Sequence, residues 1–182
     1  MTVSPATIPG LWVIEYDVHR DDRGSFARVF DREVFAAHGL CTEFPQHGRA
    51  TNARRGVVRG LHYQTAPFAE HKVVRCSRGT VWDVVLDARR GSPSYGHWEA
   101  FELAGEHPRM LFLCAGLAHG YQTLSEESEL HYLLSAPYAP AHAAGVNWRD
   151  PALAIGWPLP AAIVSAHDAA LPLLADAPDS TS

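Results

Sequence analysis

The sequence predicts an all-β sandwich or barrel, judging from its strand-like runs, their spacing and the turns between them. Between residues 73 and 135, short runs rich in Val, Leu, Phe, Tyr and Trp recur at intervals of roughly ten residues. The joining segments carry Gly, Pro, Ser and acidic residues, as in RRGSPSYG at 89–96 and ELAGEHPR at 102–109. Such clusters are typical of chain reversals.

One helix is predicted before the strands, at about residues 31–38. Asp31 stands at its N-cap, Val34 and Phe35 share one face with His38, and Gly39 is placed to end it. The strand-like runs follow at 73–77, 80–87, 97–103, 109–114, 120–125 and 129–135. The chain then becomes polar and rich in proline, so we expect a flexible tail at about 171–182.

Length and composition favour one domain covering residues 1–182. Of the 182 residues, 47% are hydrophobic, which is enough for one sizeable core. The net charge is −5 and Lys and Arg form no basic run, so nucleic acid is not an expected partner. Without a leader-like start or a long apolar run, we expect a cytoplasmic protein with no membrane contact.

Several reactive side chains form a chemically plausible set if the fold brings them together. They are Arg23, Arg59, His62, Lys72, His119, Tyr132 and Asp168. Side chains alternate between the two faces of a strand. Arg59 and Lys72 can therefore face the same interior as His62 only if bulges or turns shift this alternation. Two glycines bracket His119 in CAGLAHGYQ at 114–122. We expect a turn there, with His119 either aimed at a barrel mouth or on the surface.

The chemistry of this set favours proton transfer. His62 is a suitable general base near neutral pH, and Asp168 could fix its tautomer. Tyr132 could return a proton on the opposite side. Lys72 and His119 could stabilise an enolate oxygen. The set therefore predicts abstraction of a proton next to a carbonyl.

A metal site is the competing interpretation. His62, His71 and His119 could supply imidazole ligands, which suit first-row ions. The H-x-H pair expected of a metal-binding barrel is missing, because Tyr63 and Gln64 follow His62. Proton transfer is therefore preferred over metal binding.

An ordered series of motifs spans about residues 10–170. It comprises DDRGSF at 21–26, GVVRGLHYQ at 56–64, HKVVR at 71–75, GTVWDVVLDARRGSPSYGHW at 79–98, AGLAHG at 115–120, YAP at 138–140 and WRDPALAIGWP at 148–158. Together these motifs resemble the dTDP-4-dehydrorhamnose 3,5-epimerase family. The resemblance implies a cupin-like β jelly-roll barrel with a short N-terminal helix, no metal or other cofactor, and a homodimer.

The resemblance also implies an activity and a set of site residues. The expected reaction is epimerisation of a nucleotide-linked, dTDP-type 4-keto-6-deoxy sugar at C3, C5 or both, as in deoxysugar biosynthesis. By position, His62 is implied as the base, Asp168 as its orienting partner, Tyr132 as the acid and Lys72 as the enolate-stabilising group. Substrate contacts are implied for Arg23, Phe26, Arg59, His119 and Tyr138, and guanidinium groups suit a diphosphate.

The chain departs from the family pattern in the expected substrate-binding shell. Arg28 and Ala143 stand in place of glutamates, His47 and Arg49 in place of a glutamine and an asparagine, and His167 in place of a lysine. Because the proton-transfer residues are kept, we expect a specialised relative with a different sugar or nucleotide. The alternatives are a metal-dependent cupin enzyme and a catalytically silent cupin that binds a sugar nucleotide.

Overall fold

The computed structural model describes residues 1–161 and 163–181, and its first sheet has six strands. In spatial order these are β1 (Thr2–Pro5), β2 (Leu11–Glu15), β10 (Arg109–Leu113), β7 (Lys72–Arg78), β12 (Ser128–Leu134) and β5 (Gln46–Asn52). All neighbouring pairs are antiparallel. Strands distant in sequence therefore lie side by side, which is a feature of jelly-roll connections rather than of a simple meander.

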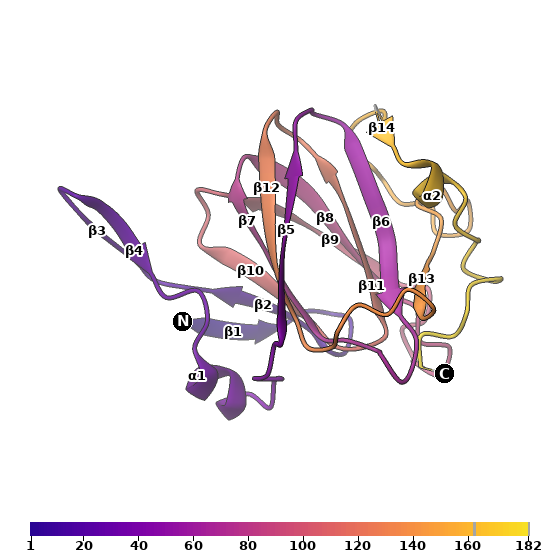
Figure 1. Cartoon of the computed structure of the whole chain (residues 1–182), viewed down its shortest axis with the longest axis horizontal. Helices are drawn as coiled ribbons and strands as arrows, with labels where there is room; N and C mark the ends of the chain where they lie inside the picture. The colour runs from indigo at the N-terminus through magenta and orange to yellow at the C-terminus, as the bar shows by residue number, and fades with distance from the viewer. Residues whose placement is uncertain (162, 182) are drawn as a thin grey trace.

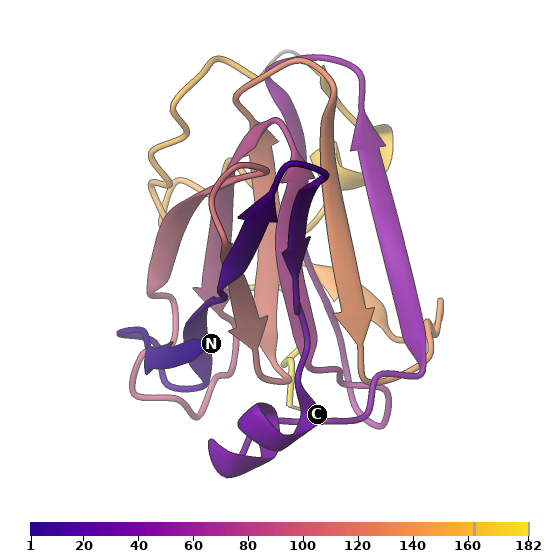
Figure 2. The same ribbon diagram turned by 90° about the vertical axis from the view of Figure 1, so that its left-hand side faces the viewer.

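The second sheet faces the first. Its order is β13 (Ala143–Gly145), β6 (Val57–Gln64), β11 (Leu117–Thr123), β8 (Thr80–Asp87) and β9 (Trp98–Ala104), with β14 (Ile163–Val164) pairing to β6 in parallel. Figures 1 and 2 show the two layers packed face to face. The predicted all-β fold is confirmed.

Alternating side chains of both sheets fill the space between the layers. Val74, Leu111 and Leu130 of the first sheet pack with Val81 and Val85 of the second, and all five are fully buried. This alternation is what the period of two along a strand requires of a sheet with one face on the core. The site described below lies at one end of this interior.

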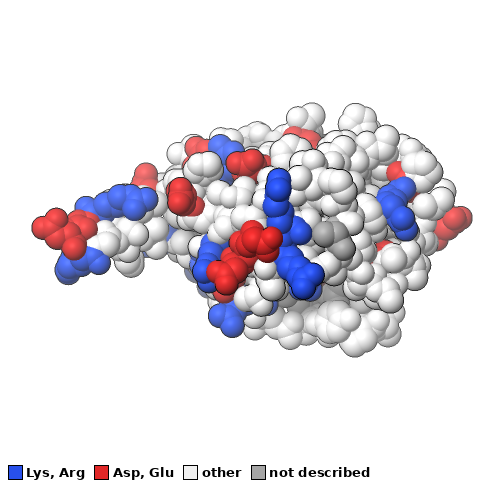
Figure 3. All heavy atoms as spheres, turned by 90° about the horizontal axis from the view of Figure 1, so that it is seen from above, with Lys and Arg blue, Asp and Glu red and all other residues white. Residues whose placement is uncertain are grey.

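The N-terminal segment leaves the barrel before returning to it. A hairpin of β3 (Val18–Asp21) and β4 (Gly24–Ala27) projects away from both sheets (Figure 1). Its exposed turn, residues 20–23, carries two arginines and two aspartates. Both signs of charge are visible on this projection in Figure 3.

The predicted helix is present as α1 (Arg32–Ala37). Asp31 caps it by accepting hydrogen bonds from the backbone N–H groups of Glu33 and Val34. Phe35 is buried among aromatic neighbours and meets Phe112 edge to face, with 6.1 Å between ring centroids. A second helix, α2 (Ala166–Ala169), has only four residues and was not predicted. Within the described residues, no helix has the length and apolar character needed to cross a membrane.

The C-terminal segment differs from the flexible tail that we expected. Leu174 and Ala177 are buried against the outer face of the second sheet. The backbone N–H of Leu174 donates to Asp150 at 2.7 Å. Apolar residues spaced through a polar, proline-rich stretch therefore suffice to hold residues 171–181 against the barrel.

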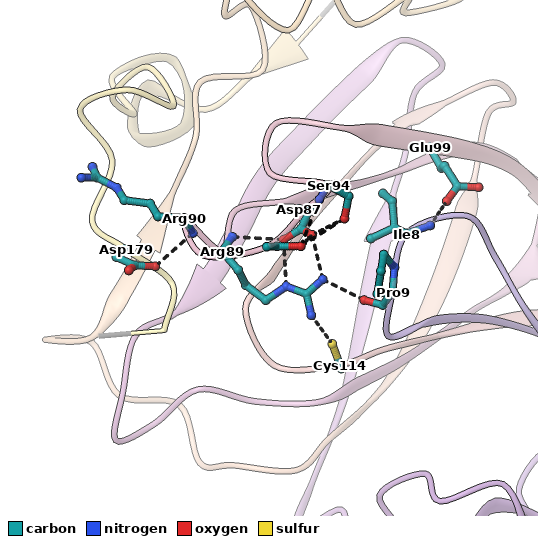
Figure 4. A network of polar contacts seen from close by, with 10 residues as sticks. Ile8, Pro9, Asp87, Arg89, Arg90, Ser94, Glu99, Cys114 and Asp179 are labelled. Carbon is teal, nitrogen blue, oxygen red and sulfur yellow. Dashed lines mark hydrogen bonds and ion pairs between the residues drawn. The ribbon is translucent and has the colours of Figure 1, made fainter.

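An ion-pair network fixes one end of the barrel (Figure 4). The guanidinium of Arg89 donates to Asp87 at 2.8 and 2.7 Å and to the carbonyl of Pro9 at 2.7 Å. The hydroxyl of Ser94 donates to the same carboxylate at 2.6 Å. Because Asp87 is fully buried, these donors offset the cost of burying its charge. The network joins the end of β8 to the N-terminal turn.

Candidate active site

A cavity of about 390 Å³ opens between the two sheets. Eight of the side chains predicted for the site line it, namely Arg59, His62, Lys72, His119, Tyr132, Tyr138, Ala143 and His167. They come from both sheets, from the segment after β12 and from α2. Residues spread over more than one hundred positions of the chain thus converge on one space.

A bulge explains how Arg59 and His62 come to face the same cavity. On β11, His119 pairs with His62 and Tyr121 with Arg59, so two steps on one strand match three steps on the other. The extra residue in β6 reverses the alternation of its side chains. The prediction that Arg59 and His62 share an interior needed such a shift in alternation, but the sequence alone did not show where it occurs.

Gly60 lies at the centre of this bulge. Its φ is +107°, and a Cβ built there would lie 2.6 Å from the carbonyl oxygen of His119 and from the Cα of Gly120. Only glycine fits both the backbone conformation and the close approach of β11. The backbone N–H of Gly60 also donates to Asp168 at 3.0 Å, so the bulge binds the carboxylate of the site.

His62 and Asp168 form a hydrogen-bonded pair. The Nε2 of His62 lies 2.9 Å from Oδ1 of Asp168, which α2 places beside β6. Burial opposes ionisation of Asp168, but the hydrogen bonds from His62 and Gly60 outweigh it and hold the pKa of the carboxyl below its usual value. The His62 side chain is 42% exposed, whereas that of Asp168 is 6% exposed. The arrangement leaves the imidazole accessible and its partner fixed.

Tyr132 reaches the cavity from β12 in the other sheet. Burial raises its pKa well above the usual value, and the neighbouring Tyr121 and Asp83 act in the same direction. The phenol therefore stays protonated at neutral pH. A protonated hydroxyl in this position can donate a proton to bound substrate.

His119 is held by a buried carboxylate. Its Nε2 lies 2.8 Å from Oδ2 of Asp83, and both residues are buried. Burial raises the pKa of Asp83, and the His119 contact opposes that rise. The expectation that His119 lies on a turn was wrong, because β11 begins at Leu117 and His119 is inside the strand.

A polar chain orients Arg59. Its Nε donates to Oδ1 of Asn52 at 2.9 Å, and the hydroxyl of Tyr121 donates to the same oxygen at 3.2 Å. Asn52 is 4% exposed and Tyr121 is 2% exposed. The buried end of the guanidinium is thus fixed, while Arg59 itself remains exposed at the mouth of the cavity.

Sequence reasoning missed Asp83, Asn52, Tyr121 and Glu70 as members of the site. One signal was available: Asp83 is an acid inside the apolar run TVWDVVLD, and a charge in a buried strand needs a partner. Asn52 and Tyr121 carried no comparable signal, because their importance depends on which strands become neighbours.

His47 and Arg49 do not line the cavity. They pair across the sheet with Leu133 and His131, which lie on the outer face of β12. Directly opposed residues share a face, so both side chains point away from the site, and Arg49 lies 3.7 Å from Glu129 there. The face of β5 that meets the cavity carries Ala50 instead.

The hairpin residues also lie outside the cavity of their own chain. The Arg23 side chain is 90% exposed and pairs with Asp21. Phe26 is 67% exposed. Arg28 pairs with Asp31 at 3.2 Å, next to α1. Within one chain, the structure therefore separates these three predicted contacts from the eight that line the cavity.

The histidines considered as metal ligands do not converge. His71 stacks on Phe112 and accepts the backbone N–H of Ala115, so it does not line the cavity with His62 and His119. Among the described residues, His62, His167 and Asp168 form a group whose ligand atoms lie within 4.8 Å of one another. In that group, His62 and Asp168 are already bonded to each other.

The family model for dTDP-4-dehydrorhamnose 3,5-epimerase matches residues 5–176, nearly the whole chain. The protein belongs to this family. Within the dTDP-4-dehydrorhamnose 3,5-epimerase family, a dTDP-4-dehydrorhamnose 3-epimerase of Streptomyces niveus is 40% identical over 180 residues, covering 98% of this chain and 86% of the relative. The protein is accordingly an isomerase of the epimerase type.

Two solved structures of epimerases show the same fold. NovW, a 4-keto-6-deoxy sugar epimerase from the novobiocin gene cluster of Streptomyces spheroides, is 39% identical with a TM-score of 0.92, covering 96% of this chain and 88% of NovW. The 3,5-epimerase RmlC of Legionella pneumophila, in complex with dTDP-4-keto-L-rhamnose, is 34% identical with a TM-score of 0.90, covering 96% and 93%. The expected cupin-like jelly roll of the epimerase family is confirmed.

Proposed function

We propose that the protein epimerises a dTDP-linked 4-keto-6-deoxy sugar, with His62 as base and Tyr132 as acid. The observation that carries this proposal is that the two residues line one cavity from opposite sheets, with Lys72 beside them. A base and an acid on different sides of a ring are what inversion at carbon requires.

The reaction begins with removal of a proton next to the C4 ketone. The free nitrogen of His62 takes the proton while the C–H electrons form a C–C double bond and the ketone oxygen becomes an enolate. Asp168 stabilises the imidazolium that results. Lys72 and His119 supply positive charge or a hydrogen bond to the enolate oxygen.

Return of a proton from the other side completes the inversion. The Tyr132 hydroxyl donates to the carbon as the enolate collapses to the ketone, and solvent later restores both groups. A single ketone acidifies the protons at C3 and at C5, so the same groups can serve either carbon if the ring turns in the cavity. The orientation of the sugar then decides whether C3, C5 or both are inverted.

The nucleotide is assigned by analogy with the relatives that bind dTDP-sugars. The exposed guanidinium of Arg59, fixed through Asn52, is suited to the diphosphate because a planar fork meets two phosphate oxygens at once. Tyr138 is 66% exposed at the cavity rim and offers an aromatic surface for the base or sugar. A cytoplasmic location stays a prediction from the sequence.

In a homodimer, the hairpin residues of one copy could reach the active-site cavity of the other copy. Arg23, Phe26 and Arg28 match expected substrate contacts. Arg23 and Phe26 belong to the β3–β4 hairpin, and this hairpin projects away from the barrel (Figure 1). A second copy could receive this hairpin at its cavity. An apolar groove of about 470 Å³ on the outer face of the first sheet, with Phe30, Val73 and Leu133 in its lining, offers a surface for that copy.

Deuterium incorporation tests the proposed reaction directly. The protein is incubated with dTDP-4-keto-6-deoxyglucose in deuterated water, and the sugar is analysed by mass spectrometry and proton NMR. We expect deuterium at C3, at C5 or at both. If the sugar nucleotide stays intact without exchange, while a panel of other nucleotide-linked 4-keto sugars also fails, the proposed epimerase activity is wrong.

A further inference from the structure

Glu70 is a nearly buried carboxylate at the cavity to which the mechanism above gives no role. It lines the cavity together with Lys72, and the side chains of both residues are only 9% exposed. Its Oε1 lies 3.2 Å from Nζ of Lys72. A charge so well shielded from water has to be compensated, and the Lys72 ammonium provides the compensation.

The ammonium of Lys72 is held by two neighbours. Nζ donates to the carbonyl oxygen of His62 at 3.2 Å and meets the Glu70 carboxylate at the same distance. An ammonium has three N–H donors, so one donor remains for a substrate oxygen. The contact with the His62 backbone also ties the cation to the strand that carries the base.

Glu70 is itself fixed by a hydrogen-bonded frame. The side-chain amide of Gln64 donates to Oε2 of Glu70 at 3.3 Å and to the carbonyl of Pro137 at 3.2 Å. The side-chain oxygen of Gln64 accepts a hydrogen bond from the backbone N–H of Ala139 at 2.7 Å. Gln64 is 3% exposed, so this frame is shielded from solvent and links β6 to the segment that carries Tyr138.

From these contacts, we propose that Glu70 is a positioning residue that holds the Lys72 ammonium where the enolate oxygen develops. A lysine side chain has many rotamers, and fixing its end in advance removes an ordering cost from the transition state. The inference rests on the proposed epimerase function. It gives Glu70 no contact with substrate, so its effect has to pass through Lys72.

A double-mutant cycle separates this role from a structural one. Glu70→Ala is measured alone and in a Lys72→Met background, in which the stem of the lysine remains and its charge is gone. We expect Glu70→Ala alone to lower kcat by about 10-fold or more with KM changed by less than about threefold. In the Lys72→Met background we expect a further change in kcat of less than about twofold.

Glu70→Asp is the second variant, because it keeps the buried charge and withdraws the carboxylate by one methylene. We expect it to lower kcat in the wild-type background and to leave kcat unchanged beside Lys72→Met. Glu106→Ala, on an exposed turn, is the matched control and should match the wild type. Melting temperatures of all variants report whether the fold is kept.

The outcomes distinguish the inference from the proposed function. If the Glu70 substitutions lower kcat by the same factor with and without the Lys72 charge, or leave kcat unchanged in the wild-type background, the positioning role is wrong. If the wild type exchanges no deuterium into any 4-keto sugar nucleotide, the proposed function fails first. Wild-type activity with a non-additive cycle supports both.

Discussion

His62 and Tyr132 line the same cavity from opposite sheets, on β6 and β12. His62 is paired with a carboxylate whose pKa is lowered, whereas burial raises the pKa of Tyr132. The two groups are therefore prepared for different tasks at the same pH, one to accept a proton and one to donate it. This division of roles gives the first prediction.

Tyr132→Phe should uncouple proton abstraction from inversion. Because His62 and Asp168 are unchanged, we expect deuterium still to enter the sugar, while formation of the inverted product falls by about 100-fold or more. The measurement is proton NMR of product and of exchange in the same sample. Tyr95→Phe, whose hydroxyl bonds to the carbonyl of Leu174 outside the cavity, is the control. Inverted product at the wild-type rate would remove Tyr132 from the mechanism.

Asp168 makes a pH-dependent contribution to stability. Its pKa in the folded protein lies below the usual 3.8, so its charged form is favoured by folding. The stabilisation is complete above the unfolded pKa and is lost as the pH falls through the folded pKa. We therefore expect the wild type to exceed Asp168→Asn in free energy of unfolding at neutral pH, with the gap closing below about pH 4.

Urea denaturation at a series of pH values measures this gap. Asp22→Asn, in the exposed hairpin turn, is the control and should show no such pH-dependent difference from the wild type. If the difference in free energy of unfolding between the wild type and Asp168→Asn is unchanged down to pH 2, folding does not favour the charged form of Asp168.

Variants of the β3–β4 hairpin and of the barrel, mixed in one dimer, test whether each site is shared between two subunits. His62→Ala should be inactive through its barrel, and an Arg23→Ala/Phe26→Ala double variant should be impaired through its hairpin. If sites combine one chain's hairpin with the other chain's barrel, randomly mixed subunits should recover about a quarter of wild-type activity, because about half the dimers are mixed and each has one intact site. Co-expression followed by activity assay measures this recovery.

A mixture of His62→Ala with Asp168→Asn is the control for the mixing experiment. Both substitutions damage the barrel, so no exchange of hairpins can repair a site. If this mixture recovers as much activity as the mixture of barrel and hairpin variants, the shared site is contradicted. A monomer by analytical ultracentrifugation would contradict it as well.

Gly60 makes the site possible by allowing the bulge in β6. Gly60→Ala would place a methyl group 2.6 Å from the His119 carbonyl at a φ of +107°. We expect a loss of about 2 kcal/mol or more in stability and a larger loss of activity, because Asp168 and His62 both depend on this backbone. Gly91→Ala, with open space around it, is the control and should unfold like the wild type in a thermal melt.

The sequence predicted the strands better than it predicted the faces of the strands. Apolar runs and turn residues located β7, β8, β9, β10 and β12 within a few positions. Asp31 identified the helix start because an N-cap is a local interaction. In contrast, the bulge opposite His119 is set by the partner strand, and no pattern within β6 alone locates it.

The same limit explains the successes and failures at the site. The chemistry of their side chains brought His62, Lys72, Tyr132 and Asp168 into one proposal, and the structure places these residues around one cavity or in direct contact with a residue that lines it. The substrate contacts expected of His47 and Arg49 stay predictions, because their side chains share the face of Leu133 and His131 and do not line this cavity. The local sequence gives the type of each residue, whereas the pairing with the neighbouring strand decides to which face of the sheet its side chain points.

The prediction of an altered binding shell is best tested at two cavity positions, Ala143 and His167. Ala143 and His167 line the cavity, where glutamate and lysine are expected from the resemblance. Alanine has no carboxylate and imidazole has no ammonium group, so contacts to a dTDP-linked sugar would be weaker if those groups bind it. Ala143→Glu and His167→Lys, each made alone, should each lower KM for dTDP-4-keto-6-deoxyglucose by about 10-fold, since one charged hydrogen bond contributes about 1.5 kcal/mol or more. Ala175→Glu, at an exposed position of the C-terminal segment, is the control for added charge. A KM that stays at the wild-type value in both restored variants, with kcat also unchanged, would show that these positions do not set substrate choice.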